Sequence, residues 1–321
     1  MLVLFNYAFM CLIFGTTFLA IKVGVSAEAP PFFLAGIRFL AAGAILFLWM
    51  ALRGKARFGL LLRKALALSG FCLTFVTFAA LYWAEQYVSS GIAAVLSATG
   101  PMMILVLQAV VWRQRTSLLS AAGCAVGFAG VVLIMLPHLA EGAHPRWWIG
   151  SGVVLLGEAG YALGAIYAKS VTQRHASESP IAINAVQMAY GGLMLLALSA
   201  FTERVPVGAL ADSAAAGSLL YLTVVGSMFG HSLFYWLVAR TNPVFPATWL
   251  YVSPPIALAV GALFLNERVA WISGLGVATV MAGTALANGP TLKRLLRRPS
   301  PDGTRLPSPE AARNRRRSHG A

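Results

Sequence analysis

Charged residues are scarce in this chain. Only 11% of its 321 residues are Asp, Glu, Lys or Arg, whereas 59% are hydrophobic and the mean hydropathy is +0.76. A water-soluble domain cannot bury that much apolar surface. We therefore expect the lipid bilayer to be the solvent of most of the chain.

Signatures of catalysis and of metal or nucleotide binding are also missing. The sequence has no phosphate-binding glycine loop that ends in Lys, and no His-Glu-x-x-His motif. Its only cysteines, Cys11, Cys72 and Cys124, fall in apolar stretches without metal-site spacing, so we expect them to be apolar fillers. We predict no enzyme activity, no metal site and no cofactor, and we expect no ATP-driven pump.

Long apolar runs dominate what is present. Ten of them have the length of about 17–25 residues that crosses the hydrocarbon core, and each should be a helix, because only a helix satisfies its own backbone polar groups in lipid. The predicted spans are 4–25, 32–51, 66–86, 90–111, 117–136, 148–169, 181–201, 215–239, 244–265 and 271–288.

The chain repeats itself across these spans. Tyr82-Trp83 recurs 153 residues later as Tyr235-Trp236. The same spacing relates three further pairs, namely Pro101 and Pro254, Gly123 and Gly276, and Gly130 and Gly283. Five spans fall in each half, so the second half should be inverted relative to the first. We predict an all-α membrane protein with ten helices, built as two inverted five-helix repeats around a central cavity.

The predicted boundaries follow from the repeat. They are a first repeat over 1–136, a periplasmic loop over 137–147, a second repeat over 148–288 and a basic, disordered cytoplasmic tail over 289–321.

Positive charge predicts the orientation. Nineteen Lys and Arg residues fall on the side of both termini, and only Arg146, Arg204 and Arg268 fall on the other. The positive-inside rule places both termini in the cytoplasm of a multi-pass protein of the inner (cell) membrane. The net charge of +14 then needs no nucleic-acid partner.

Matched prolines indicate where a cavity could lie. Pro101 is midway along the fourth span and Pro254 midway along the ninth. A proline inside a helix frees the carbonyl four residues earlier, which is Ser97 for Pro101, and a free carbonyl at membrane depth must face protein or a water-filled cavity. Matched interruptions are typical of a transport site, although a simple kink is the alternative.

Ionisable residues inside spans are the second indication. Glu158 is the most central carboxylate; burial would favour its protonated form, so it could handle protons, or it could form a permanent ion pair with Arg38 or Lys22. Arg38 is too deep to reach water and needs a partner, such as Glu85 or an anionic solute. His231 could titrate or be a hydrogen-bonded core residue.

Aromatic residues gather on four of the spans. Either they stack on an organic solute or they pack against lipid and protein. The candidates for the cavity are Tyr82, Trp83, Tyr161, Trp249 and Tyr251. Gly-x-x-x-Gly pairs, such as Gly160 and Gly164, allow close helix contacts and are compatible with a homodimer.

Several motifs resemble the EamA-type family of the drug/metabolite transporter superfamily. They are Gly15–Lys22, Pro30–Gly43 and Ala84–Pro101 in the first half, and Gly226–Tyr235, Ala247–Pro255 and Asn266-Glu267 in the second. One departure is that Trp112–Arg115 stands where the first copy of the family usually has Gly-Glu. The resemblance implies ten helices around a central cavity and the export or exchange of small metabolites, amino acids or drugs by alternating access.

Three hypotheses for the function follow. The first is a secondary transporter of a small-molecule solute; the alternatives are a passive channel or facilitator, and a non-transporting membrane receptor or scaffold. The matched prolines fit both a carrier and a channel, but only a carrier saturates and shows counterflow.

Overall fold

The computed structural model describes residues 1–111, 113, 117–140, 144–174, 178–206, 208–240, 246, 248–267 and 270–296. Within these residues every regular element is helical, and no strand occurs. Eight helical segments are long and apolar enough to cross a membrane, and two shorter apolar ones cover Trp249–Leu265 and Trp271–Ala287. The predicted all-α, multi-pass membrane protein is confirmed, and the inverted repeat remains a prediction.

The helices of the first half run from α1 to α7. They are α1 (Leu2–Ser26), α2 (Pro31–Leu52), the 3₁₀-helix η1 (Phe58–Leu62), α3 (Lys64–Gly70), the π-helix η2 (Phe71–Val76), α4 (Thr77–Ala84), α5 (Ser90–Ser97), α6 (Gly100–Val110) and α7 (Leu118–Ala140).

The helices of the second half run from α8 to α14. They are α8 (Pro145–Arg174), α9 (Pro180–Thr202), α10 (Ser213–Tyr221), the π-helix η3 (Leu222–Gly230), α11 (His231–Arg240), α13 (Trp249–Leu265) and α14 (Trp271–Leu296). The α7 helix continues to Ala140 and α8 begins at Pro145, so both helices extend into the predicted loop over 137–147. Residues 297–321 of the predicted tail lie outside the described residues.

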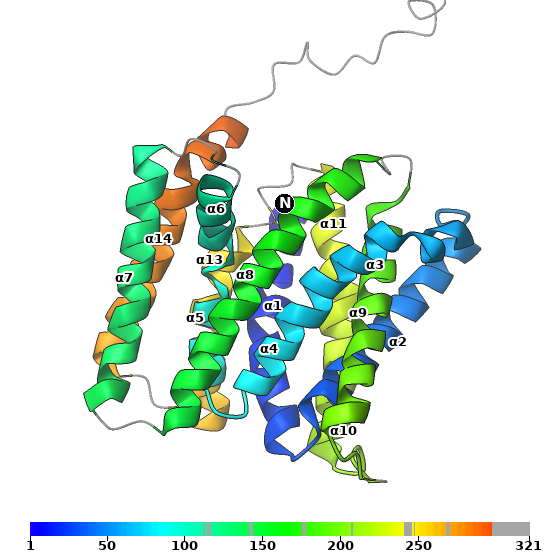
Figure 1. Cartoon of the computed structure of the whole chain (residues 1–321), viewed down its shortest axis with the longest axis horizontal. Coiled ribbons are helices and arrows are strands. Elements are labelled where there is room, and N and C mark those ends of the chain that lie inside the picture. The colour runs from blue at the N-terminus through cyan, green and yellow to red at the C-terminus, as the bar shows by residue number, and fades with distance from the viewer. Residues whose placement is uncertain are drawn as a thin grey trace, which may run out of the picture.

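Helices pair across the two halves in a regular way. The most extensive contacts join α7 to α14 and α2 to α9, and each of these pairs unites the predicted repeat mates (Figure 1). In the same manner α1 packs on α13, while α8 packs on α5 and α6. Each of these contacts therefore has a counterpart: if every helix is replaced by its repeat mate, the same pairs of helices are in contact. The start of α1 and the end of α14 lie at one end of the molecule, and the loop between α4 and α5 lies at the other (Figure 1).

Glycines allow the α7–α14 pair to approach closely. A Cβ on Gly130 would lie 2.8 Å from the carbonyl oxygen of Gly276, and a Cβ on Gly276 would lie 2.8 Å from that of Gly130. Gly123 and Gly283 face each other similarly, each with a Cβ position 2.7 Å from the other's carbonyl oxygen. Lipid tails are as apolar as the side chains, so this contact of small residues provides the packing that a hydrophobic effect cannot.

Both third spans contain a π-helical segment at a corresponding place. In the first half α3 is followed by η2 and α4, and in the second α10 is followed by η3 and α11. The wider turn of a π-helix shifts the side-chain register of everything after it and often marks a functional site. The two segments bring Tyr82 and Ser227 to the interior, where Arg38 joins them.

The glycine packing gives a test of the fold. Gly276→Ala should lower the thermal unfolding midpoint in detergent, because the new Cβ would lie 2.7 Å from Cγ1 of Ile134; overpacking of this kind costs about 1–3 kcal/mol. Gly274→Ala is the matched control on the same helix, since nothing lies within 4 Å of its Cβ position. Equal midpoints for the two variants would contradict the close contact between α7 and α14.

Candidate functional site

The fourth span is interrupted at its middle by a short turn whose two residues stay in the right-handed helical region. The α5 helix ends at Ser97 and α6 begins at Gly100, with a turn at Ala98 and Thr99 between them. Pro101 stands in the first turn of α6, where its missing N–H would have had no helical partner in any case. The sequence predicts Pro101 midway along one span, and the structure places it at the start of the second of two half-helices.

The break faces α8 of the other half. A Cβ on Gly100 would lie 2.5 Å from Oε2 of Glu158 and 3.3 Å from Cδ1 of Tyr161, so a side chain at this position would displace the carboxyl group and press on the ring. Glu158 is 6% exposed. Oγ of Ser97 is buried without a hydrogen-bond partner among the described residues. We call Ser97, Gly100, Glu158 and Tyr161 the Glu158 cluster; it could hold a polar group of a solute.

Arg38 forms a second interior group. It is 2% exposed, and its guanidinium donates from Nε to Oγ of Ser227 at 2.9 Å and from Nη1 to the hydroxyl of Tyr82 at 3.0 Å. The rings of Phe39 and Phe78 lie 4.5 and 5.4 Å from Cζ, within the range of cation–π attraction. Arg38 of the first half thus binds Ser227 of the second, and its hydrogen bonds go to hydroxyls rather than to Glu85.

The second half differs at the matched position. The α13 helix continues through Pro254 and Pro255, of which Pro254 is buried and Pro255 exposed. The break at Pro101 therefore has no counterpart of the same kind in α13. The prolines match in the repeat, but the backbone around them differs between the halves.

Aromatic candidates of the second half pack on α1. The rings of Trp249 and His231 lie 4.6 and 5.7 Å from that of Phe14. Nδ1 of His231 also lies 3.3 Å from Nδ2 of Asn184, which fits a hydrogen-bonded interior histidine. The hydroxyl of Tyr251 donates to the carbonyl of Thr284 on α14 at 3.3 Å. Trp249 and His231 thus contact α1, and Tyr251 contacts α14.

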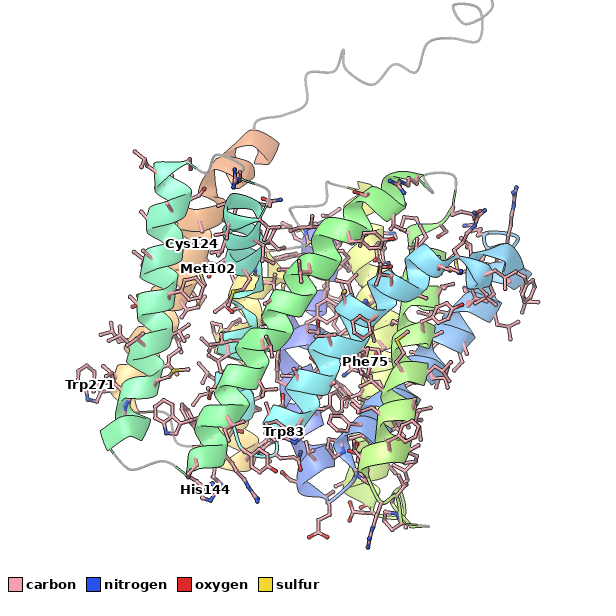
Figure 2. All side chains as sticks on the ribbon, in the orientation of Figure 1. Phe75, Trp83, Met102, Cys124, His144 and Trp271 are labelled. Carbon is pink, nitrogen blue, oxygen red and sulfur yellow. The ribbon has the colours of Figure 1, made fainter. Side chains whose placement is uncertain are left out.

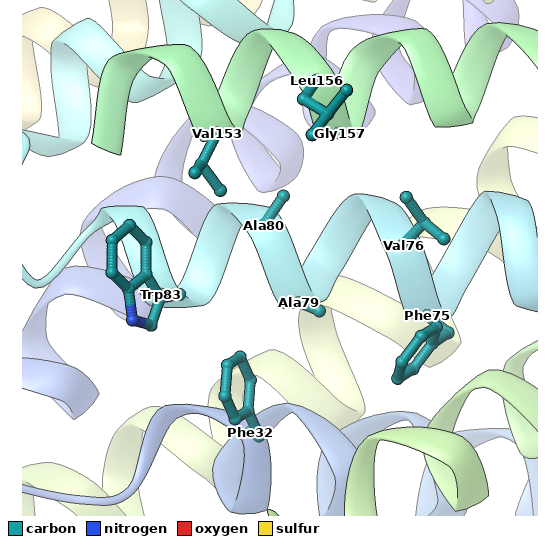
Figure 3. Close-up of a pocket in the computed structure, with 9 residues that line it drawn as sticks. All are labelled: Phe32, Phe75, Val76, Ala79, Ala80, Trp83, Val153, Leu156 and Gly157. Atoms are coloured by element: carbon teal, nitrogen blue, oxygen red, sulfur yellow. The ribbon is translucent and has the colours of Figure 1, made fainter. Parts of the chain in front are cut away.

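Trp83 points to a different side from its neighbour Tyr82. It lines an apolar pocket of about 410 Å³ between α4 and α8, closed at one side by Phe32 of α2 (Figure 3). The rim includes Leu156, which is 71% exposed, so at membrane depth the pocket would open towards lipid. Figure 2 places Trp83 at the same end of the molecule as His144. This pocket is therefore separate from the interior groups.

Charged residues gather at the α4–α5 loop. Nζ of Lys22 donates to the carbonyls of Glu85 at 2.5 Å and Val88 at 3.0 Å. The carboxylate of Glu267 accepts from the amide and hydroxyl of Ser90 at 2.8 and 3.0 Å. The ammonium of Lys22 thus lies at the C-terminal end of α4, and the carboxylate of Glu267 lies at the N-terminal end of α5. The helix dipoles favour both arrangements. We call Lys22, Glu85, Ser90 and Glu267 the loop cluster.

Backbone geometry directs Glu267 to that loop. Asn266 ends α13 in the left-handed region, with φ 51, and the amide of Glu267 returns to the carbonyl of Gly261 at 3.2 Å. Asn tolerates this conformation better than most residues. A corresponding carboxylate, Glu203 after α9, accepts from the amides of Phe32 and Phe33 at the start of α2 at 2.8 and 2.9 Å.

Sequence reasoning misses Ser227 and the role of the loop carboxylates. Ser227 adjoins Gly226 of a small-residue pair, and only the π-helical register brings it to Arg38. By sequence Glu267 is a charge at a helix end, and no pattern links it to Ser90, 177 residues away. Among the described residues, no group of three His, Cys, Asp or Glu could hold a metal ion.

Comparison with known proteins identifies the family. Residues 1–136 and 148–289 match the EamA-like transporter family. The chain is 30% identical to the uncharacterized inner membrane transporter YedA of Escherichia coli (strain K12) over 280 residues, which is 86% of this chain and 87% of that one. It is also 30% identical to a probable terminal-alkyne amino-acid exporter of Streptantibioticus cattleyicolor over 214 residues, 67% of this chain and 69% of that one.

Similarity extends to a solved structure. A crystal structure superposes with a TM-score of 0.60 and covers 92% of this chain and 99% of its own, at 16% identity. That likeness concerns the fold alone. The matches in sequence cover both halves, confirm the resemblance drawn from the motifs and show a multi-pass membrane transporter: the chain belongs to the EamA-like transporter family.

Proposed function

We propose that this transporter is a secondary carrier, an exporter or exchanger of small metabolites, amino acids or drugs that works by alternating access. The observation that carries the proposal is the pairing of helices, which is the same when the halves are exchanged. In carriers with inverted repeats, one half can adopt the conformation of the other and so move the opening from one side of the membrane to the other. Such an arrangement favours ten helices in two inverted repeats.

We place the solute at the Glu158 cluster. The break between α5 and α6 leaves helix ends beside Glu158, and broken helices at mid-membrane are where carriers bind their solutes. Beside Glu158, Ser97 offers a hydroxyl and Tyr161 offers a ring. Glu158 would attract an ammonium group, and one relative is named a probable amino-acid exporter, so amino acids come first among the solutes to test.

Other interior residues receive supporting roles. Arg38, with Tyr82 and Ser227, would line the cavity between the halves and keep its charge partnered as they move. Trp249, His231 and Tyr251 would form the opposite wall near α1 and α14. Pro254 would soften α13 at the place that corresponds to the break. Trp83 faces the lateral pocket, from which an amphipathic solute could enter.

The orientation remains the one predicted from charge. Both termini would lie in the cytoplasm, so the loop cluster and His144 would lie at the outer end. The start of α1 and the end of α14 lie opposite that end in the fold (Figure 1). The end that carries the α4–α5 loop and His144 is therefore the outer end.

Counterflow separates a carrier from the alternatives. Proteoliposomes preloaded with pooled amino acids and metabolites should take up labelled members of the pool transiently above equilibrium, with saturation. A cysteine introduced at His144, in protein without native cysteines, reports the orientation by its labelling from outside. Flux that neither saturates nor shows counterflow would indicate a channel, and binding without flux a receptor.

The broken helix gives a second test. Pro101→Ala should favour a continuous fourth span. In a continuous helix the proline would lie in the interior and cost about 3 kcal/mol, and alanine removes that cost. Counterflow should fall by about tenfold or more, because about 1.4 kcal/mol already corresponds to a factor of ten, while membrane insertion stays normal. Pro255→Ala, at an exposed proline, is the matched control. Wild-type counterflow in Pro101→Ala would remove the break from the transport cycle.

Glu158 gives a third test. If it carries the coupling proton, Glu158→Gln mimics the protonated form and should abolish accumulation driven by a pH gradient while leaving exchange partly intact. Glu28→Gln, at an exposed carboxylate, is the control and should accumulate solute as wild type does. Continued pH-driven accumulation in Glu158→Gln would exclude this residue as the coupling site.

A further inference from the structure

Glu85 is a fully buried carboxylate without a hydrogen-bond donor among the described residues. It is 0% exposed, and neither Oε1 nor Oε2 accepts a hydrogen bond from any described residue. Glu203, Asp212 and Glu267 each accept two or three hydrogen bonds. A buried ionised carboxylate without donors costs several kcal/mol, and such a group takes up a proton instead.

The charged side chains around Glu85 make their hydrogen bonds to other groups. Three charged side chains act on it electrostatically, Lys22 from α1, Arg38 from α2 and Glu267 from the segment after α13. Lys22 donates to two carbonyls of the α4–α5 loop, and Arg38 donates to Tyr82 and Ser227. Glu267 is itself an acid and disfavours a second negative charge nearby. The cations therefore lie near Glu85 without donating to its carboxylate.

The position of Glu85 connects it to movement of the outer end. It directly follows α4, and the loop that it begins is held by Lys22 of the first half and Glu267 of the second. An opening at this end has to separate α1 or the segment after α13 from the loop. Separation of α1 would free the ammonium of Lys22, separation of the segment after α13 would withdraw Glu267 from Ser90, and either would bring water to the carboxylate.

We infer that Glu85 is a second proton-binding site, which holds a proton while the outer end is closed and releases it when that end opens. On opening, the O–H bond of the acid breaks, its electron pair stays on the carboxylate, and the proton passes to water. The inference rests on the proposed carrier function, and it adds an acid at the outer end to the one at Glu158.

Infrared spectroscopy tests the proton directly. The purified protein in lipid at neutral pH should show the C=O stretching band of a buried carboxylic acid that is missing in Glu85→Gln and retained in Glu158→Gln. Glu85→Asp, which keeps the acid and shifts the band, gives the assignment if the Gln variant does not insert. A spectrum of Glu85→Gln identical to that of wild type in this band would overturn the inference.

The pH dependence of the unfolding midpoint tests independently whether Glu85 holds a proton. An unfolded Glu ionises above about pH 4.3, so a folded state that keeps the proton loses stability as the pH rises, and Glu85→Gln does not share this loss. The unfolding midpoint of Glu85→Gln should therefore equal or exceed that of wild type, with a difference that grows with pH. Glu267→Gln, at a carboxylate that accepts hydrogen bonds, should lower the midpoint.

Two outcomes would give Glu85 a role other than proton binding. A midpoint of Glu85→Gln below wild type, with the loss absent in a Lys22→Met background, would make Glu85 and Lys22 a permanent ion pair. Loss of the infrared band when choline chloride is replaced by sodium chloride at fixed pH would make the ligand sodium. None of these measurements needs a transported solute, so a failure of counterflow would count against the carrier and not against the proton.

Discussion

The hydrocarbon core offers no water to polar groups, and the rest of the structure follows from that constraint. Every span is helical because its backbone must bond within itself. The cations that the sequence places inside are both partnered. Arg38 donates to two hydroxyls and lies on two rings, and Lys22 donates to two carbonyls. Glu85 has no donor among the described residues, which is why it stands out.

Small residues provide the packing that apolar burial provides in a soluble protein. Helices α7 and α14 approach through Gly123, Gly130, Gly276 and Gly283, whose missing side chains let backbone meet backbone. Because these glycines are repeat mates, the two helices contribute equivalent surfaces to the contact. The α7–α14 and α2–α9 pairs then form the flanks, and the proposed solute site lies between them, on α5, α6 and α8.

The halves differ at their interior polar residues. The fourth span is broken beside Glu158, whereas α13 is continuous through its two prolines. Glu267 reaches the start of α5, and the first half has Gln114, outside the described residues, in the position related by the repeat.

The sequence by itself determined the membrane-spanning character of the chain and its family, because hydropathy and the spacing of Gly, Pro and aromatic residues are local properties that can be read without coordinates. It also selected Glu158 and Arg38, since an ionisable residue inside an apolar run is conspicuous. It could not pair Arg38 with Ser227 or Glu267 with Ser90, because those contacts join residues 189 and 177 positions apart. Only the tertiary structure, through the π-helical register of the third spans and the left-handed turn at Asn266, decided which polar groups meet and left Glu85 without a donor among the described residues.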